Sequence, residues 1–227
     1  MAVATKNKPT KLIPSDGPEQ TVAVTPLQEG VLKFKLTGTA PYVQARFSQK
    51  AMRAIEDKHR AGSTSKKGKS KEPRDFDLEY EQAMHKMADG TCGIPAGAFR
   101  SALISACRLV GFRMTLAKLS LFVEADGLDV VDGVPLVRIS GTPEPVTHAV
   151  RNATGVCDLR RRPMWRQWSA EVNVRFDMSQ FTAADVYNLL LRVGHQVGVG
   201  EGRPDSKEST GMGWGTFNVE VVNEDRP

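Results

Sequence analysis

Thr182-Ala-Ala-Asp-Val-Tyr-Asn-Leu-Leu-Leu-Arg-Val193 is followed by Gly194-His-Gln-Val-Gly-Val-Gly-Glu-Gly-Arg-Pro-Asp205 and, after more glycines, by Thr216-Phe-Asn-Val-Glu-Val-Val222. The first segment predicts a helix, because Thr182 is a good N-cap and Asp185 stands three residues later in a variant of the capping box. The last segment predicts a strand. The seven glycines between them are typical of backbone that turns sharply or closely approaches another chain.

The composition excludes several classes of protein. The chain has 227 residues, 40% hydrophobic and 25% charged, which indicates one large globular domain. No apolar run approaches the roughly 20 residues of a membrane span, and the N-terminus lacks a signal-peptide core. Three scattered cysteines, Cys92, Cys107 and Cys157, argue for reduced thiols in the cytoplasm and against a disulfide framework or a zinc site. No cofactor or metal is expected.

The positive charge is concentrated in two clusters, although the net charge is only +5. Such clusters are typical of a surface that binds polyanions, and equally of two solvated loops. The first cluster holds Lys58, Arg60, Lys66, Lys67, Lys69, Lys71 and Arg74 against Glu72; the second holds Arg151, Arg160, Arg161, Arg162 and Arg166 against Asp158.

Periodicity along the rest of the chain predicts further elements. Leu32, Phe34 and Leu36 alternate with polar residues and predict a half-buried strand over 31–37. Pro95 at the start and Gly111 just past the end bound a helix over 95–110. Strands are expected over 119–124, 136–139 and 168–176, a short strand over 21–24, helices over 47–60 and 77–87, and a loop without large apolar residues over 61–73.

The order of these elements predicts an α+β fold. Without insertions it is strand, helix, strand, strand, helix, strand, the ferredoxin-like (RRM-like) arrangement of an antiparallel sheet with both helices on one face. Residues 1–30 are then a polar arm, 31–222 the domain, and 223–227 a polar tail. The domain carries insertions over 40–92, a long thumb-like segment, and over 145–166.

A second motif opens the first long helix: Ile94-Pro-Ala-Gly-Ala-Phe-Arg-Ser-Ala-Leu103. A helix start presents free N–H groups and a positive dipole end to anions, and small residues there let a phosphate backbone come close. Arg100 could add a charge-assisted contact. Taken alone, the motif also fits a proline-initiated helix packed tightly on a sheet.

Together with the glycine-rich loop, this motif resembles the RAMP superfamily, the ferredoxin-fold RNA-binding proteins of CRISPR effector complexes. The phrase Val197-Gly-Val-Gly-Glu-Gly-Arg-Pro204 is also similar to a pattern common in bacteriophage proteins. The resemblance implies a backbone subunit that grips single-stranded RNA in repeated units, with Arg100 on the nucleic-acid backbone. The groove for the strand would be formed by the helix start and the loop, where Gly198, Gly200 and Gly202 admit the strand and Arg203 marks its edge.

The resemblance also implies an inserted thumb that reaches over a neighbouring subunit. Two segments are candidates, a lysine tip in the first insertion and an arginine segment in the second. Arginine forks bind phosphates, and Trp165 could stack on bases or anchor the next strand; for Trp168 the anchoring role is preferred. The expected contacts are Lys66, Lys67, Lys69 and Lys71 in the tip and Arg160, Arg161, Arg162, Trp165 and Arg166 in the segment.

These features predict a non-enzymatic protein that binds single-stranded RNA or DNA and assembles in several copies along it. Other CRISPR or phage proteins are possible partners. The alternatives are an endoribonuclease of the same fold and a phage protein that binds or inhibits another protein. For a nuclease, Asp75 or Asp77 would be the nearest candidate acids and His195 or His85 the candidate histidines, although a lone histidine is more often structural. The sequence contains no nucleotide-binding P-loop, dinucleotide fingerprint or serine nucleophile elbow.

Overall fold

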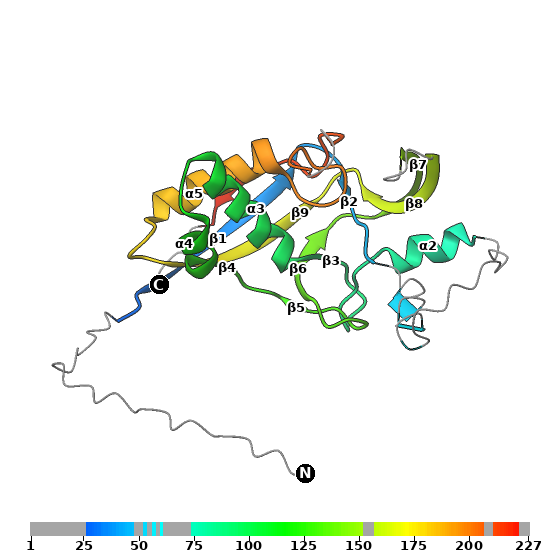
Figure 1. Ribbon diagram of the computed structural model, residues 1–227, viewed down its shortest axis with the longest axis horizontal. Coiled ribbons are helices and arrows are strands. Elements are labelled where there is room, and N and C mark those ends of the chain that lie inside the picture. The colour runs from blue at the N-terminus through cyan, green and yellow to red at the C-terminus, as the bar shows by residue number, and fades with distance from the viewer. Residues whose placement is uncertain are drawn as a thin grey trace, which may run out of the picture.

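The computed structural model describes residues 26–47, 52–53, 56–57, 60, 74–151, 157–206 and 211–222. This part of the chain is an α+β structure of antiparallel sheets and helices, as the sequence predicts. Figure 1 shows a main sheet with helices packed on it, and a smaller sheet and a short helix at one end. The predicted strand over 21–24, the loop over 61–73, the tail and most of the predicted helix over 47–60 lie outside the described residues.

Within the described residues the main sheet has seven strands, all in antiparallel pairs. Strand β1 pairs with the edge strand β10 on one side and with the central strand β9 on the other. Both β4 and β6 pair with β9, along different stretches of it, and β6 continues the sheet to β3 and β5. The strands are β1 (Glu29–Gly38), β3 (Gly93–Pro95), β4 (Leu121–Val123), β5 (Gly127–Leu128), β6 (Pro135–Ser140), β9 (Ser169–Asp177) and β10 (Phe217–Val221).

The two faces of this sheet differ in polarity. Phe34 and Leu36 are fully buried, and the register places Phe34 opposite Val172 and Leu36 opposite Ala170, both of them buried. Lys35 points to the other face and is exposed. Because successive residues of a strand face opposite ways, the alternation in the sequence predicts this inner face correctly.

Two helices cover the apolar face, α3 (Ala96–Leu109) and α5 (Ala183–Arg192) (Figure 1). The capping box at α5 is confirmed: the Thr182 hydroxyl accepts from the backbone N–H of Asp185, and the Asp185 side chain accepts from the N–H of Thr182. Gly111 follows α3 with a φ of 73°, as expected for the residue after a helix end. None of the helices in the described ranges is long and apolar enough to cross a membrane.

The two predicted insertions come together in a second, three-stranded sheet in the described part of the chain. Its strands are β2 (Tyr42–Val43), β7 (Glu144–Arg151) and β8 (Cys157–Trp165), and β8 lies in the middle. Most of the segment over 145–166 is therefore a β-hairpin, which the sequence analysis did not predict. The register pairs Tyr42 with Trp165 and so joins the start of the first insertion to the end of the second.

Two short helices complete the described structure. The predicted helix over 77–87 is shorter, α2 (Phe76–Gln82), and it packs on β8. Asp75 caps it by accepting a hydrogen bond from the backbone N–H of Leu78 at 2.9 Å. The predicted strand over 119–124 is only β4, because α4 (Met114–Ser120) occupies the residues before it.

Candidate nucleic-acid interface

The glycine-rich loop follows α5 through a π-helical turn, η1 (Val193–Val197). Gly200 has a φ of 85°, and a Cβ at this residue would lie 2.6 Å from both the carbonyl oxygen of Val43 and the ring of Tyr42. A Cβ at Gly202 would lie 2.5 Å from the ring of Trp214. The close approach that these glycines permit is therefore to the protein's own β2 and Trp214. These contacts by themselves require glycine here, and the prediction that the glycines also admit a nucleic-acid strand stays a prediction.

A groove of about 360 Å³ nevertheless separates this loop from α3. Gly97 and Ser101 line it from the helix, and Gly198, Gly200 and Arg203 line it from the loop. The predicted meeting of the helix start with the glycine-rich loop is therefore confirmed. A Cβ at Gly97 would meet no atom within 4 Å, so this wall is open. The first turn of a helix carries free N–H groups and a positive dipole end, which favour an anion here.

One charged residue of each sign lines the groove. Asp205 accepts hydrogen bonds from Ser105 Oγ at 2.6 Å and from Arg108 Nη2 at 3.1 Å, so its carboxylate is already engaged with α3. Arg203 donates through Nη1 to the carbonyl oxygen of Gly200 at 3.1 Å, which uses one of its five N–H groups. The guanidinium of Arg203, with its remaining N–H groups, supplies the positive charge available to a ligand in the groove.

Arg100 does not line this groove, which corrects its predicted role. Its Nε donates to the carbonyl oxygen of Leu121 at 2.9 Å, and its Nη2 donates to the carbonyl oxygen of Lys118. The guanidinium also lies 4.5 Å from the centre of the Phe122 ring. Because the last carbonyl groups of a helix carry the negative end of its dipole, Arg100 stabilises the end of α4 and ties it to α3.

Three arginines of the predicted segment, Arg160, Arg161 and Arg162, lie on β8, and Arg166 directly follows it; acidic residues accompany them. Arg162 donates through Nε to Glu201 of the glycine-rich loop at 3.2 Å. Arg160 lies farther from its carboxylates, at 3.6 Å from Asp158 and 3.7 Å from Glu201. Glu201 is therefore a link between the loop and β8, and it accounts for part of the positive charge that the sequence assigned to this segment.

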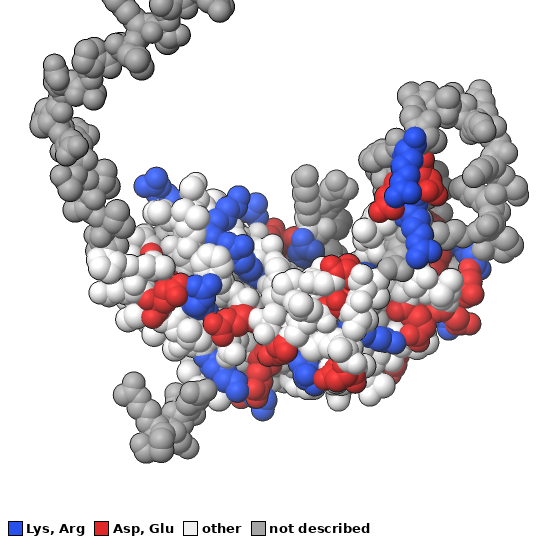
Figure 2. Space-filling model, turned by 90° about the horizontal axis from the view of Figure 1, so that it is seen from below, with Lys and Arg blue, Asp and Glu red and all other residues white. Residues whose placement is uncertain are grey.

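The other two arginines of the segment also have partners. Arg161 lies 3.0 Å from Asp77 on α2, and Arg166 lies 2.8 Å from Glu144 on β7. Figure 2 shows basic and acidic side chains next to one another over the visible face, without a broad area of one sign. The predicted lysine contacts fall outside the described residues: Lys66, Lys67, Lys69 and Lys71.

Trp165 is fully buried and cannot stack on a base, which corrects its place among the predicted binding residues. Its ring centre lies 5.5 Å from that of Tyr42, and its indole N–H has no hydrogen-bond partner in the described part of the chain. Trp168, whose anchoring role was predicted, is buried and donates to the carbonyl oxygen of Ala40 at 2.9 Å. Both tryptophans therefore hold the smaller sheet against the core.

A buried polar network surrounds His85, one of the two candidate histidines. His85 Nδ1 lies 2.9 Å from Asp129 Oδ2, and Arg46 lies 3.6 Å from the same carboxylate and 3.0 Å from Asp132. Donor atoms of His85, Asp129 and Asp132 lie within 4.8 Å of one another, a spacing that a metal ion could bridge. Asp129, however, already accepts from the backbone N–H groups of Val131 and Asp132 at 2.8 and 3.2 Å. Arg46 supplies the positive charge, so this network is complete without a metal.

The same contacts set the acidity of Asp129. Burial raises the pKa of this carboxyl, but hydrogen bonds from Val131, Asp132 and His85 and the charge of Arg46 outweigh it, so the pKa lies below its ordinary value. A carboxyl with a depressed pKa stabilises the folded state above its unfolded pKa of about 3.9. That stabilisation is lost as the pH falls through the lower, folded pKa.

Asp129→Asn is therefore expected to lower the free energy of unfolding by about 1–3 kcal/mol at pH 7, because hydrogen bonds to a buried charged group are lost. The variant should then lose less additional stability than the parent between pH 5 and pH 2. Urea denaturation across this range measures both effects. Asp77→Asn is the control, because the Asp77 side chain is 87% exposed. Equal acid sensitivity of the Asp129→Asn protein and the parent would contradict the expectation.

The remaining nuclease candidates have no catalytic arrangement in the described structure. Asp75 caps α2, and Asp77 pairs with Arg161. His195 lies exposed in η1 at the end of α5, where a positive charge would suit the helix dipole.

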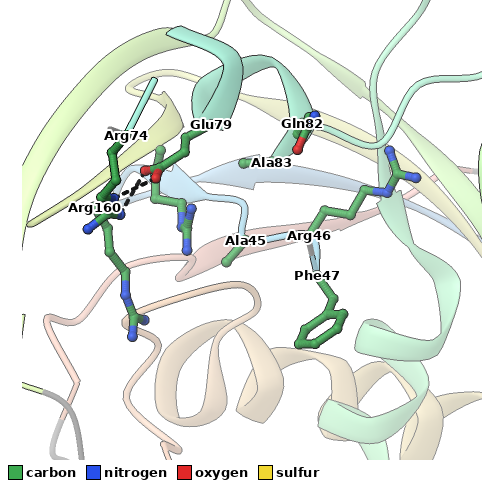
Figure 3. Close-up of a pocket in the computed structure, with 9 residues that line it drawn as sticks. Ala45, Arg46, Phe47, Arg74, Glu79, Gln82, Ala83 and Arg160 are labelled. Atoms are coloured by element: carbon green, nitrogen blue, oxygen red, sulfur yellow. Dashed lines mark hydrogen bonds and ion pairs between the residues drawn. The ribbon is translucent and has the colours of Figure 1, made fainter. Parts of the chain in front are cut away.

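A second recess, the arginine-lined pocket, lies between α2, β8 and residues 45–47 and has a volume of about 420 Å³. Figure 3 shows Arg74 and Glu79 hydrogen-bonded at one side, Arg160 extending past them, and Phe47 on the opposite side. The guanidinium of Arg46 points away from this cluster toward Asp129 and Asp132. The lining residues are Ala45, Arg46, Phe47, Arg74, Glu79, Gln82, Ala83, Arg160 and Arg162.

The sequence analysis did not identify most of this pocket. Arg160 and Arg162 are two residues apart on β8, and the strand period of two places them on one face. If a strand had been predicted here, the sequence would have indicated that these two arginines lie side by side. Arg46 and Phe47 carried no such signal, since they stand outside any described helix or strand.

No protein-family model matches the chain, and no curated protein matches it.

Proposed function

We propose that this protein binds single-stranded nucleic acid in the groove between α3 and the glycine-rich loop. The observation that carries the proposal is the groove itself, in which a helix start with an open wall at Gly97 faces the loop and Arg203. These groups suit a sugar-phosphate backbone, because N–H groups and one guanidinium recognise phosphate without reading bases. Two further guanidinium groups, those of Arg160 and Arg162, lie against Glu201 of the same loop, which offsets part of their charge.

The core is, in this proposal, ferredoxin-like, and the protein a relative of the RAMP proteins of CRISPR or phage origin. In support, the first strand of the core, β1, lies between the last, β10, and the next-to-last, β9, with β4 and β6 beyond β9. The helices α3 and α5 follow the first and third strands of that core and cover the same face (Figure 1). Several copies would then occupy one strand, as the resemblance implies.

Gly97→Glu is the sharpest test of the groove. Gly97 is the second residue of α3, where a carboxylate suits the helix dipole, and there is room for its side chain. We therefore expect an unchanged or higher melting temperature together with binding to a single-stranded oligonucleotide that is roughly 10-fold weaker, since one misplaced charge near phosphate costs about 1.4 kcal/mol. Gel-shift titrations with RNA and DNA oligonucleotides measure the affinity and the number of copies bound per strand.

Gly97→Gln is the matched control, because it has nearly the same size without the charge. For the parent protein, neutralisation of about five phosphates would give a slope of roughly −3.5 for log K against log salt. The proposal fails if neither RNA nor single-stranded DNA binds at low salt. It also fails if Gly97→Glu, while folded, binds as tightly as Gly97→Gln.

An endoribonuclease of the same fold is the second candidate, and the observation that favours it is the 2.9 Å contact between His85 and Asp129. A histidine oriented by a carboxylate is the arrangement that general acid–base chemistry uses. Labelled RNA in the same titrations, with and without Mg²⁺, reports cleavage. Intact RNA under all conditions excludes this candidate and leaves the binding proposal in place.

A further inference from the structure

The arginine-lined pocket contains more hydrogen-bond donors than the described residues satisfy. A guanidinium has five N–H groups. Arg74 uses three nitrogen atoms, with Glu79 at 2.7 and 2.9 Å and with Asp158 at 2.6 Å. Among the described residues, Arg162 donates through Nε to Glu201, and the carboxylates nearest Arg160 lie 3.6 and 3.7 Å away.

These unpaired donors are held in place and partly shielded from water. The side chains of Arg160 and Arg162 are 35% and 18% exposed. Glu201 and Asp158 lie behind them and fix the guanidinium groups without lining the pocket. Oriented, partly desolvated guanidinium groups bind phosphate strongly, because its oxygens accept two or more hydrogen bonds at once.

The opposite side of the pocket has a different chemistry. Phe47 is 59% exposed, and its ring stands across the recess from Arg74 and Arg160 (Figure 3). Gln82 adds an amide, which can both donate and accept. An exposed aromatic ring and an amide are the groups on which a nucleobase stacks and hydrogen-bonds.

We propose that this pocket binds one nucleoside phosphate, with the phosphate at Arg74, Arg160 and Arg162 and the base against Phe47. The volume of about 420 Å³ lies in the range of roughly 300–1,000 Å³ that small-molecule sites occupy. The nucleotide is either a free mononucleotide or one unit of a bound strand. The inference deepens the proposed function, but it involves a recess on the other side of the glycine-rich loop and can be tested separately.

Isothermal titration calorimetry of the full-length protein with nucleoside 5′-monophosphates, unphosphorylated nucleosides and inorganic phosphate tests the site. We expect the monophosphate to bind most tightly. The double variant Arg160→Gln/Arg162→Gln should weaken it at least roughly 10-fold, since hydrogen bonds to charged groups are lost while glutamine can still reach Glu201. Arg138→Gln is the control, because Arg138 is an ion-paired arginine outside the pocket, and it should bind like the parent.

Phe47→Ala separates a nucleotide site from a simple phosphate site. It should weaken the monophosphate roughly 5-fold or more through lost stacking and leave inorganic phosphate unchanged. No monophosphate binding at millimolar concentration, an unaffected double variant that is folded, or an unaffected Phe47→Ala protein would each overturn the proposal.

A competition arm identifies the source of the nucleotide. An oligonucleotide that displaces the monophosphate assigns the pocket to a unit of the strand, and one that binds without displacing it assigns the pocket to a free nucleotide. Strand binding without monophosphate binding overturns this inference and leaves the proposed function standing. Monophosphate binding without strand binding overturns the proposed function and leaves this inference standing.

Discussion

Gly200→Val is expected to lower the free energy of unfolding by about 2–6 kcal/mol or to prevent folding altogether. A branched residue at a φ of 85° costs about 1–3 kcal/mol in backbone strain, and the forced displacement of neighbours adds about 1–3 kcal/mol. The displaced neighbours would be the Tyr42 ring and the carbonyl oxygen of Val43, each 2.6 Å from the new Cβ. The valine side chain would therefore push the loop away from β2. Urea denaturation followed by circular dichroism measures the loss.

Gly97→Ala is the control for this substitution. A Cβ at Gly97 meets nothing within 4 Å, and alanine in a helix is favoured over glycine by up to about 1 kcal/mol, so this variant should be at least as stable as the parent. A Gly200→Val protein with parental stability would contradict the reported packing of the loop. It would also restore the idea that the glycine is there for an external strand.

Trp165→Ala is the second substitution with a large expected effect. It should lower the free energy of unfolding by about 3–5 kcal/mol, because it removes a fully buried aromatic side chain and leaves a cavity beside Tyr42. Trp165 pairs with Tyr42 across β8 and β2, so the loss loosens the smaller sheet from the core. The measurement is again the midpoint and slope of urea denaturation.

Trp165→Phe provides the comparison. The indole N–H of Trp165 has no partner among the described residues, so phenylalanine gives up no hydrogen bond there; it leaves a smaller cavity than alanine and should cost less than Trp165→Ala. If Trp165→Phe is as damaging as Trp165→Ala, the indole N–H is hydrogen-bonded and the described packing is incomplete. If both are neutral, Trp165 is not a core residue.

The elements that the sequence predicts well are those with an unambiguous period. β1 alternates over Leu32, Phe34 and Leu36, and α5 begins with a capping box that is local in sequence. The hairpin of β7 and β8 was not predicted, because prolines and charged residues interrupt both strands. Pro145 and Pro163 in fact stand opposite each other in its register. Such a hairpin is specified by pairing across the chain and by packing on β2 and α2, not by the pattern of either strand alone.

The candidate site, too, was predicted only in part from the sequence. The meeting of the helix start with the glycine-rich loop was predicted from the resemblance to the RAMP proteins. The direction of Arg100 depends on α4, a helix that the sequence analysis did not place. The neutralisation of Arg161 by Asp77 joins residues far apart in the chain, and counting charges within one segment cannot reveal it.

Glu201 gives the two recesses a thermodynamic connection. It belongs to the loop that forms one wall of the groove, its backbone N–H donates to Val43 at 2.9 Å, and its carboxylate holds Arg162 of the pocket. A ligand of the groove that displaced this loop would therefore change the affinity of the arginine-lined pocket for the proposed nucleotide. Linkage would require the reverse effect to be equal, so that one coupling free energy would describe both effects.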